Sequence, residues 1–396
     1  MDWKQRAAAL ARTAAHPGSP WYGPVMATPR HLCVPRWFTA GPEGWTPADG
    51  PADESAWASA AYADRTLVTQ VGPVHADHAM DGETVIGLPT SSSTLPSLVV
   101  SMLTHGRLSD GQALLDVATG SGYSAALASA RLGDDFVTTV DIDPYLTEAA
   151  AERLDAIGHH PKLLTQDATG HLPGEYDRIV SMVSVPRIPA SWLRALRPGG
   201  RLVTTLAGTG LILTADKAED GGAAGRIEWD RAAFMETRTG ADYPPLLNEL
   251  FTQVRDQDGD VVTDSPFPVL NVTQAWEVWS MLSLTAPGIE HRTGTDDDGN
   301  PVAWMLHPDG SWARAETKPA SRAAIVHQGG PRRLYDMLDA VRWRWLEHGE
   351  LPVYGARVTI APDGGTTLAR GGWTVTLEGR WGPGRLVGRG EREVRG

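Results

Sequence analysis

An acidic residue followed by a glycine-rich turn is the feature of this sequence with the clearest capacity for binding chemistry. Residues 116–123 read Asp-Val-Ala-Thr-Gly-Ser-Gly-Tyr, after an apolar run and before an alanine-rich stretch. Gly120 and Gly122 let the backbone approach a ligand where a Cβ would collide, and a helix starting there presents unpaired N–H groups. The expected contacts of a small polar ligand in this turn are Asp116, Thr119, Gly120, Ser121, Gly122 and Tyr123.

Two further carboxylates narrow the class of ligand. Asp141, followed by Ile142, ends the next β-rich run, at the separation of about twenty residues where an acid accepts from ribose hydroxyls. Asp167, followed by Ala168, ends the third run and suits the amino group of an adenine. Acids at three successive strand ends beside a glycine turn favour a binding function over scattered surface charges.

The position of Asp116 separates two kinds of nucleotide cofactor. The spacing Gly120-x-Gly122-x-x-Ala125 also satisfies the dinucleotide fingerprint, and the ribose acid is common to both kinds. A carboxylate at the turn would repel a pyrophosphate, whereas it would favour the ammonium group of an amino-acid moiety. These residues therefore favour S-adenosylmethionine, which is cationic and zwitterionic, over a dinucleotide.

The elements that must position these acids alternate between β-rich runs and helical stretches, as in a parallel sheet covered by helices. The expected strands are residues 113–119, 136–142, 162–166, 176–185 and 200–207. Between the second and third strands, Asp143 fits the N-cap of a helix, Pro144 its first position and Gly158 its C-terminal stop. The predicted fold class is α/β, with a mostly parallel, Rossmann-like sheet.

This half of the chain resembles the class I methyltransferases, and within them the protein L-isoaspartyl O-methyltransferase family. The resemblance covers roughly residues 28–207, on the stretches PRHLCVPRWF, AYADRTL, TSSSTLPSLVVSM, LLDVATGSGYSAALA, VDIDPYL, TQDATG, YDRIVSMVSVPRIP and LRPGGRLV. It implies S-adenosylmethionine as methyl donor, S-adenosylhomocysteine as product, and a side-chain or isomerised aspartyl carboxylate as acceptor. Two positions depart from the family pattern, because Thr94 stands where serine is common and Cys33 where phenylalanine is common.

The Ser/Thr run at residues 90–94 is the expected place for orienting the acceptor. The expected catalytic residues are Thr94 and Ser93, the expected cofactor contact is Ser92, and the expected substrate contacts are Val185 and Pro186. A carboxylate is already ionised at neutral pH, so no strong base is required. Holding the carboxylate in line with the methyl group can lower the reaction barrier by on the order of 7–11 kcal/mol. The alternative is that this run merely caps the helix expected from Pro96.

The form TSSSTLPSLV, the preceding YADRTLVTQ and the later GGPRRLYDMLDAVRWRW look more like variant isoaspartyl methyltransferases found with ribosomally made peptide pathways. As a group, those methylate an aspartate in a constrained peptide rather than repair aged proteins. The resulting methyl ester is open to attack by the next backbone nitrogen, which gives a succinimide and, on hydrolysis, aspartate or isoaspartate. General protein repair is the close rival interpretation.

A change of composition after residue 215 predicts two parts. Residues 1–215 are expected to form the methyltransferase domain, with a substrate or lid segment over about 1–112, and residues 216–396 an α+β accessory region that recognises the peptide. Residues 217–225 are expected to be a turn-rich connection or a linker. Pro-Asp-Gly at 308–310 and 362–364 predicts hairpins, and the apolar spacing over 332–349 predicts a helix. Packing on the catalytic domain or dimerisation is the alternative role for this region.

Composition excludes several other classes. The chain has 396 residues and a formal charge of −13, which argues against nucleic acid or an anionic membrane as a partner. A single cysteine, Cys33, fits a small core residue in a reducing cytosol and rules out an intramolecular disulfide. Residues 1–16 read as a short amphipathic helix rather than a signal peptide, and the apolar stretch 202–215 is shorter than a membrane span. The expected location is the cytoplasm.

Two rival functions stay open at this point. A catalytically idle peptide-binding protein would retain the fold, although intact acids at 116, 141 and 167 speak against it. A dehydrogenase is disfavoured because no hydride-transfer constellation is recognisable. No metal is expected, because the histidines at 75, 78, 159 and 160 lack an evident further ligand.

Overall fold

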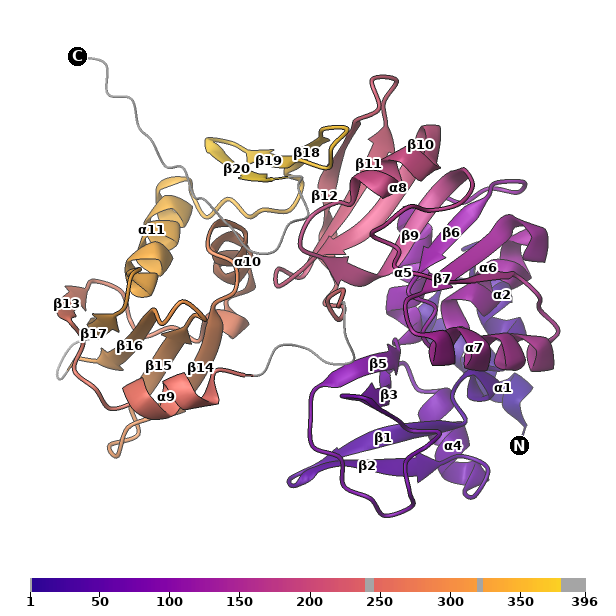
Figure 1. Cartoon of the computed structure of the whole chain (residues 1–396), viewed down its shortest axis with the longest axis horizontal. Coiled ribbons are helices and arrows are strands. Elements are labelled where there is room, and N and C mark those ends of the chain that lie inside the picture. Colours follow the sequence, from indigo (N-terminus) through magenta and orange to yellow (C-terminus); the bar gives the residue numbers. More distant parts are fainter. Residues whose placement is uncertain (1, 239–245, 319–322, 379–396) are drawn as a thin grey trace.

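A computed structural model describes residues 2–238, 246–318 and 323–378 of the chain (Figure 1). Within these ranges the strands form three sheets, of which the largest has the order β20-β19-β18-β12-β11-β10-β9-β6-β7-β8. We call it the main sheet. None of the helices in the same ranges is both long enough and apolar enough to cross a membrane.

One half of the main sheet is parallel and contains the strands predicted around the acids. They are β6 (Leu114–Val117), β7 (Val137–Asp141), β8 (Lys162–Thr165), β9 (Tyr176–Val185) and β10 (Leu196–Leu206). The chain runs outward from β6 through β7 to β8 and then crosses to β9 and β10 on the other side of β6. Such a reversal of strand order opens a crevice at the carboxyl ends of the strands, which is where ligands bind in this class of sheet.

Helices cover both faces of the parallel strands, which confirms the α/β fold class. Consecutive residues of a strand point to opposite faces, so Leu114 packs into one core and Leu115 into another. The first core is covered by α1 (Trp3–Ala14), α2 (Tyr22–Ala27), α5 (Pro96–His105), α6 (Tyr123–Leu132) and α7 (Pro144–Ile157), and the second by α8 (Ala190–Ala195). The Asp143 carboxylate accepts the Tyr145 N–H and the chain leaves α7 at Gly158, as predicted.

The other half of the main sheet is antiparallel and differs from the predicted division at residue 215. It consists of β11 (Leu211–Lys217), β12 (Ala223–Arg231), β18 (Arg357–Ile360), β19 (Thr366–Arg370) and β20 (Trp373–Leu377). Residue 215 lies inside β11, and residues 217–225 close a hairpin in which Lys217 faces Ala223. The expectation of a turn-rich connection is confirmed and that of a linker is wrong, because a polar, glycine-rich run suits a tight turn as well as a connection between domains.

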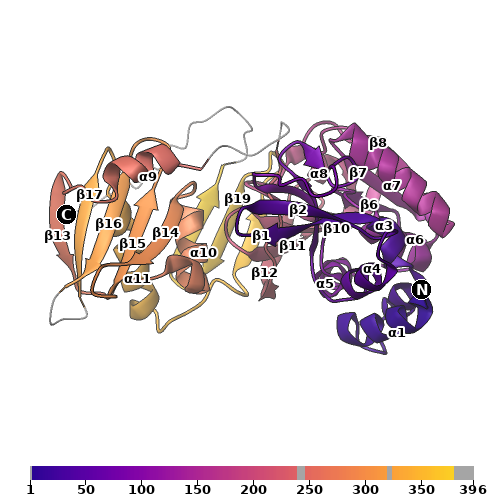
Figure 2. The same cartoon turned by 90° about the horizontal axis from the view of Figure 1, so that it is seen from below.

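The C-terminal part also forms a sheet of its own, with the order β13-β17-β16-β15-β14 (Figure 2). The strands are β13 (Val261–Ser265), β14 (Glu290–Thr295), β15 (Pro301–Leu306), β16 (Trp312–Thr317) and β17 (Ala324–Gly329), with α9 (Asn248–Val254), a 3-10 turn (Val272–Gln274), α10 (Trp276–Thr285) and α11 (Leu334–Glu347). Both Pro-Asp-Gly hairpins and the helix near 332–349 are confirmed.

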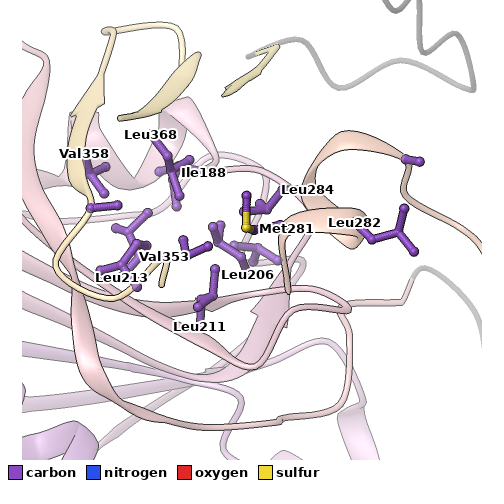
Figure 3. Packing of buried hydrophobic residues seen from close by; sticks show 14 of the residues in the cluster. Ile188, Leu206, Leu211, Leu213, Met281, Leu282, Leu284, Val353, Val358 and Leu368 are labelled. Carbon is purple, nitrogen blue, oxygen red and sulfur yellow. The ribbon is translucent and has the colours of Figure 1, made fainter. Parts of the chain in front are cut away.

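Helix α10 joins the C-terminal part to the main sheet. Figure 3 shows apolar side chains of β10, β11, α10 and β18 meeting in one cluster, including Leu206, Leu211 and Met281. Two donors of α10, Trp276 Nε1 and Ser280 Oγ, reach the Thr209 carbonyl at 3.0 and 2.7 Å. Gly210 permits this approach, since a Cβ at that position would stand 2.7 Å from Trp276 Nε1.

An N-terminal antiparallel sheet carries the Ser/Thr run toward the crevice. Its strands are β1 (Arg36–Gly41), β2 (Gly44–Asp49), β3 (Leu67–Val71), β4 (Val74–His75) and β5 (Pro89–Ser93), accompanied by α3 (Arg30–Cys33) and α4 (Glu54–Ala61). A further 3-10 turn spans Asp134–Phe136.

Cys33 is fully buried, which confirms its expected place in the core.

Candidate functional site

A cavity of about 250 Å³ lies at the carboxyl ends of β6, β7 and β8, between these strands and β5. It is the crevice expected from the reversal of strand order beside β6. Ten of the residues predicted to form the site line it: Ser92, Thr94, Thr119, Gly120, Ser121, Tyr123, Asp141, Ile142, Asp167 and Ala168.

Asp141 is fixed by the backbone on either side of it. Its Oδ2 accepts the Gly120 N–H at 3.0 Å and its Oδ1 accepts the Asp143 N–H at 3.2 Å. Burial raises the pKa of the Asp141 carboxyl, while these two N–H groups favour its ionised form. Each oxygen keeps a lone pair for a further donor, so the side chain can accept from two neighbouring hydroxyls on a ligand.

The glycine turn between β6 and α6 supplies a close backbone approach. Gly120 has φ +50° and lines the cavity, and a Cβ there would stand 3.5 Å from the Ser92 carbonyl oxygen. Gly122, with φ +83°, instead faces Ala150 of α7 and is not in the cavity wall. The turn therefore offers its backbone to a ligand at Gly120, as predicted. Gly122 is not a ligand contact, and it allows α6 to pack closely against α7.

Asp116 lies beneath the turn and does not line the cavity, contrary to its predicted direct contact with a ligand. It is fully buried, and its Oδ2 accepts from the hydroxyls of Ser124 and Thr139, each at 2.9 Å. Burial raises the pKa of Asp116 to about 7. Its Oδ1 is buried and has no hydrogen-bond partner. Asp116 thus braces the turn from below, because the β6 register points its side chain into the core.

The side chains of the Ser/Thr run do not all reach the cavity. Ser92 and Thr94 line the cavity, whereas the Ser93 hydroxyl points the other way and accepts from Arg30 Nη2 at 3.4 Å. The expectation that Ser93 acts in catalysis is therefore wrong, because its side chain is buried against Arg30 and is not in the cavity wall. Ser93 belongs to the support of the run rather than to the cavity.

The capping alternative for Thr94 does not hold in the structure. Helix α5 has no side-chain cap from the Ser/Thr run, and its first turn is held from elsewhere. The Asp64 carboxylate accepts the Ser97 N–H at 2.9 Å, and the Thr66 hydroxyl accepts the Leu95 N–H at 3.1 Å. Thr94 is consequently available to the cavity that it lines.

The predicted substrate contacts Val185 and Pro186 are not in the cavity wall. Val185 is fully buried in the core, and Pro186 is exposed outside the cavity. Near the end of β9, the backbone of Ser184 forms hydrogen bonds with the segment that follows β12. The Ser184 N–H donates to the Met235 carbonyl at 2.8 Å, and the Thr237 N–H donates to the Ser184 carbonyl at 2.9 Å.

The predicted histidines make local contacts. His75 and His78 pack their rings on Tyr145, while His159 lies 3.1 Å from the Asp134 carboxylate. Among the residues that the structure describes, no group of three or more His, Cys, Asp or Glu side chains is arranged to hold a metal ion.

The family model described as Protein-L-isoaspartate(D-aspartate) O-methyltransferase (PCMT) matches residues 60–230. A protein-L-isoaspartate O-methyltransferase of Pyrococcus horikoshii is 32% identical over 160 residues, which are 39% of this chain and 68% of that protein. The chain belongs to the protein-L-isoaspartate O-methyltransferase family.

Other relatives of this family match a shorter part. The protein-L-isoaspartate O-methyltransferase of Thermococcus onnurineus is 36% identical over 112 residues, 27% of this chain and 50% of that protein. Alignments with the first such relatives thus span about half of their length. The solved structure of a protein-L-isoaspartate O-methyltransferase from Plasmodium falciparum, in complex with S-adenosyl-L-homocysteine, aligns with 14% identity and a TM-score of 0.42, over 61% of this chain and all of that chain.

Two parts of the site were not predicted from the sequence. Arg30 is fully buried and donates to the carbonyls of Ala61, Ser93 and Thr94. It lies in the stretch PRHLCVPRWF that carries the family resemblance, which is the signal that could have drawn attention to it. Burial lowers the pKa of its guanidinium. Arg30 therefore fixes the end of the Ser/Thr run by hydrogen bonds to its backbone carbonyls.

The second unpredicted part is residues 233–238, which close one side of the cavity. The Arg238 guanidinium donates to the Thr90 carbonyl at 3.3 Å, so this segment is tied to the start of the Ser/Thr run. Burial raises the pKa of Glu236 in the same wall. The segment lies beyond residues 60–230, where the family model matches, and its sequence carries no motif that would have indicated a wall.

Proposed function

We propose that this chain is an S-adenosylmethionine-dependent O-methyltransferase that acts on an aspartyl or isoaspartyl carboxylate of a peptide or protein. One observation carries the proposal: a single cavity brings Asp141 and Gly120 together with the hydroxyls of Ser92 and Thr94. Asp141 and Gly120 suit the nucleoside end of the cofactor, Ser92 suits a further contact with the cofactor, and Thr94 suits an acceptor carboxylate. Family membership supports the same reaction.

The residues of the cavity fit that cofactor in two respects. Asp141 can accept from both ribose hydroxyls with the lone pairs that the Gly120 and Asp143 N–H groups leave free. Gly120 adds no Cβ where the ligand would lie against the turn. Asp167 and Ala168 line the far end, where Asp167 Oδ1 already accepts from Thr169. The second oxygen of Asp167 suits the amino group of an adenine.

The reaction requires placement rather than a strong base. When bound, S-adenosylmethionine supplies a methyl group on a positively charged sulfur, which keeps the electron pair of the broken carbon–sulfur bond. The acceptor carboxylate is ionised at neutral pH, so its oxygen forms the new bond without losing a proton. Thr94 would orient that oxygen by donating a hydrogen bond, while Ser92, in the same cavity, would donate to the cofactor. Proximity and orientation of this kind can lower a barrier by about 7–11 kcal/mol.

The finer proposal is that the acceptor is an aspartate side chain in a constrained, ribosomally made peptide. Attack by the next backbone nitrogen on the ester carbonyl would then release methanol and leave a succinimide. The C-terminal part supports recognition of a specific peptide, because α10 packs against the main sheet and holds this part in a fixed position near the cavity. Repair of isoaspartyl sites in general proteins is the alternative.

Transfer of a labelled methyl group tests the proposal directly. The full chain is incubated with labelled S-adenosylmethionine and either a macrocyclic peptide that contains aspartate or a linear peptide that contains isoaspartate. We expect base-labile label in at least one peptide, and preference for the macrocycle supports the finer proposal. Tight binding of S-adenosylmethionine without transfer to any peptide would instead indicate an idle binding protein.

A further inference from the structure

A groove of about 520 Å³ lies next to the cavity, between α5, the end of β12 and α10. Its walls include Leu98 and Ser101 of α5, Asp230 and Arg231 of β12, and Trp276 and Trp279 of α10. The volume lies within the range of about 300–1,000 Å³ that is common for ligand pockets. Helix α10 lies outside the residues that the family model matches, so the match to that model does not extend to this wall.

The groove continues into the cavity. Leu95, Leu98 and Ala233 belong to the walls of both. The chain that leaves β12 borders the groove at residues 230–233 and then forms the cavity wall at residues 233–238. An extended peptide advances about 3.3 Å per residue. A peptide whose carboxylate lies in the cavity would therefore place its next few residues in the groove.

The floor of the groove is apolar and its rim is charged. Trp276 is buried and its indole N–H is already bonded to the Thr209 carbonyl, whereas Trp279 is half-buried and presents aromatic surface. The Arg231 guanidinium lies over the Trp276 ring, 5.3 Å from its centroid. This combination fits a large apolar side chain on the floor, with polar groups at the rim for the peptide backbone.

Asp230 places a carboxylate among the walls of the groove. Its carboxylate accepts from Ser101 Oγ at 2.7 Å and lies 2.9 Å from His105 Nε2. The hydrogen bond from His105 is the main reason that the pKa of Asp230 falls to about 2. Since the anion is held in place by α5, it can direct a peptide N–H or a cationic group without moving.

We propose that this groove binds the peptide segment that flanks the methyl-accepting residue and selects a large apolar side chain there. The inference rests on the methyltransferase function proposed above. The proposal assigns this selection to one aromatic side chain, Trp279, which lines the groove and is not in the wall of the cavity.

The test compares peptides that differ only beside the acceptor. One set is an alanine-rich octapeptide with a central isoaspartate, and a second set has a central aspartate closed into a macrocycle. In each set, tryptophan, leucine, lysine or glutamate replaces one of the three residues on either side. Burial of a large apolar side chain predicts a preference for tryptophan or leucine over alanine of about tenfold in kcat/KM, at one position.

Trp279→Ala should reduce that preference to within about twofold, with the affinity for S-adenosylhomocysteine unchanged. Trp343→Ala is the matched control, because Trp343 is a half-exposed tryptophan of α11 outside the groove wall, and it should keep the preference. Thr273→Trp, at an exposed position of the groove wall, narrows the groove without removing any packing and should also reduce the preference.

Several outcomes would contradict the role of the groove in selecting the peptide while leaving the proposed methyltransferase function intact. Methylation without any flank preference, or a preference that survives in both Trp279→Ala and Thr273→Trp, shows that the groove does not select. A concentration-dependent dimer that Trp279→Ala abolishes, with the preference intact, makes the groove a contact between copies of this chain. If no peptide is methylated at all, the proposed function fails and the groove assignment fails with it.

Discussion

Replacing Asp141 offers the sharpest test of how the cavity holds a cofactor. Both oxygens already accept a backbone N–H, from Gly120 at 3.0 Å and from Asp143 at 3.2 Å, so the carboxylate is fixed before a ligand arrives. A ligand diol would therefore bond to a charged acceptor that needs no reorganisation. Hydrogen bonds to charged groups contribute about 1.5–3 kcal/mol, so Asp141→Ala should weaken S-adenosylmethionine binding by roughly 10- to 150-fold.

Calorimetric titration of the full chain with S-adenosylmethionine measures this change. Asp143→Ala is the matched control, because Asp143 caps α7 and is not in the cavity wall. It should lower the free energy of unfolding by about 1 kcal/mol and leave cofactor affinity within about twofold. Asp141→Asn should fall between wild type and Asp141→Ala, since one amide group would face an N–H donor. Unchanged affinity in Asp141→Ala, or tight binding of NAD in place of S-adenosylmethionine, would refute the reasoning.

Three further predictions follow from the geometry. Thr94→Val should lower kcat at least tenfold with cofactor affinity and urea stability unchanged, because Thr94 lines the cavity and does not cap α5; a lower stability with normal kcat would restore the capping interpretation. Between its ordinary pKa of 3.8 and about 7, Asp116 is protonated in the folded state and ionised in the unfolded state. The free energy of unfolding should therefore fall as the pH rises through that range. Asp116→Asn should make this decrease smaller in urea titrations at several pH values. Gly210→Ala should destabilise by about 1–3 kcal/mol more than Gly199→Ala, since both have positive φ but only the Cβ at 210 would press on Trp276; equal losses would show that α10 adapts.

Local patterns in the sequence were sufficient for the parallel half of the main sheet and for several of its helices. Apolar runs bounded by glycine and proline indicate strands whatever lies beside them, and the cap, proline and glycine around α7 act within a few residues of one another. The glycine turn and Asp141 were also accessible, because a turn with positive φ at Gly120 and an acid at the end of the next strand form one compact unit.

Tertiary structure decided which of the predicted side chains reach the cavity. Ser93 and Asp116 have the right chemistry, but the orientation of β5 and β6 in their sheets turns them toward Arg30 and the core. A shift of one residue in either strand would have reversed that outcome, and no local pattern specifies it. The structure likewise decided that Val185 is a core residue and that Ser184 pairs with the cavity wall.

The sequence by itself determined the α/β core, the glycine turn and the acid that faces the ligand, because each depends on residues close together in the chain. Only the tertiary structure decided that β18 pairs with β12, that residues 233–238 close the cavity, and that Trp276 of α10 reaches Thr209. These contacts join segments far apart in the sequence. They form only when apolar faces that no single segment can cover are buried against each other, and that burial is a property of the whole chain.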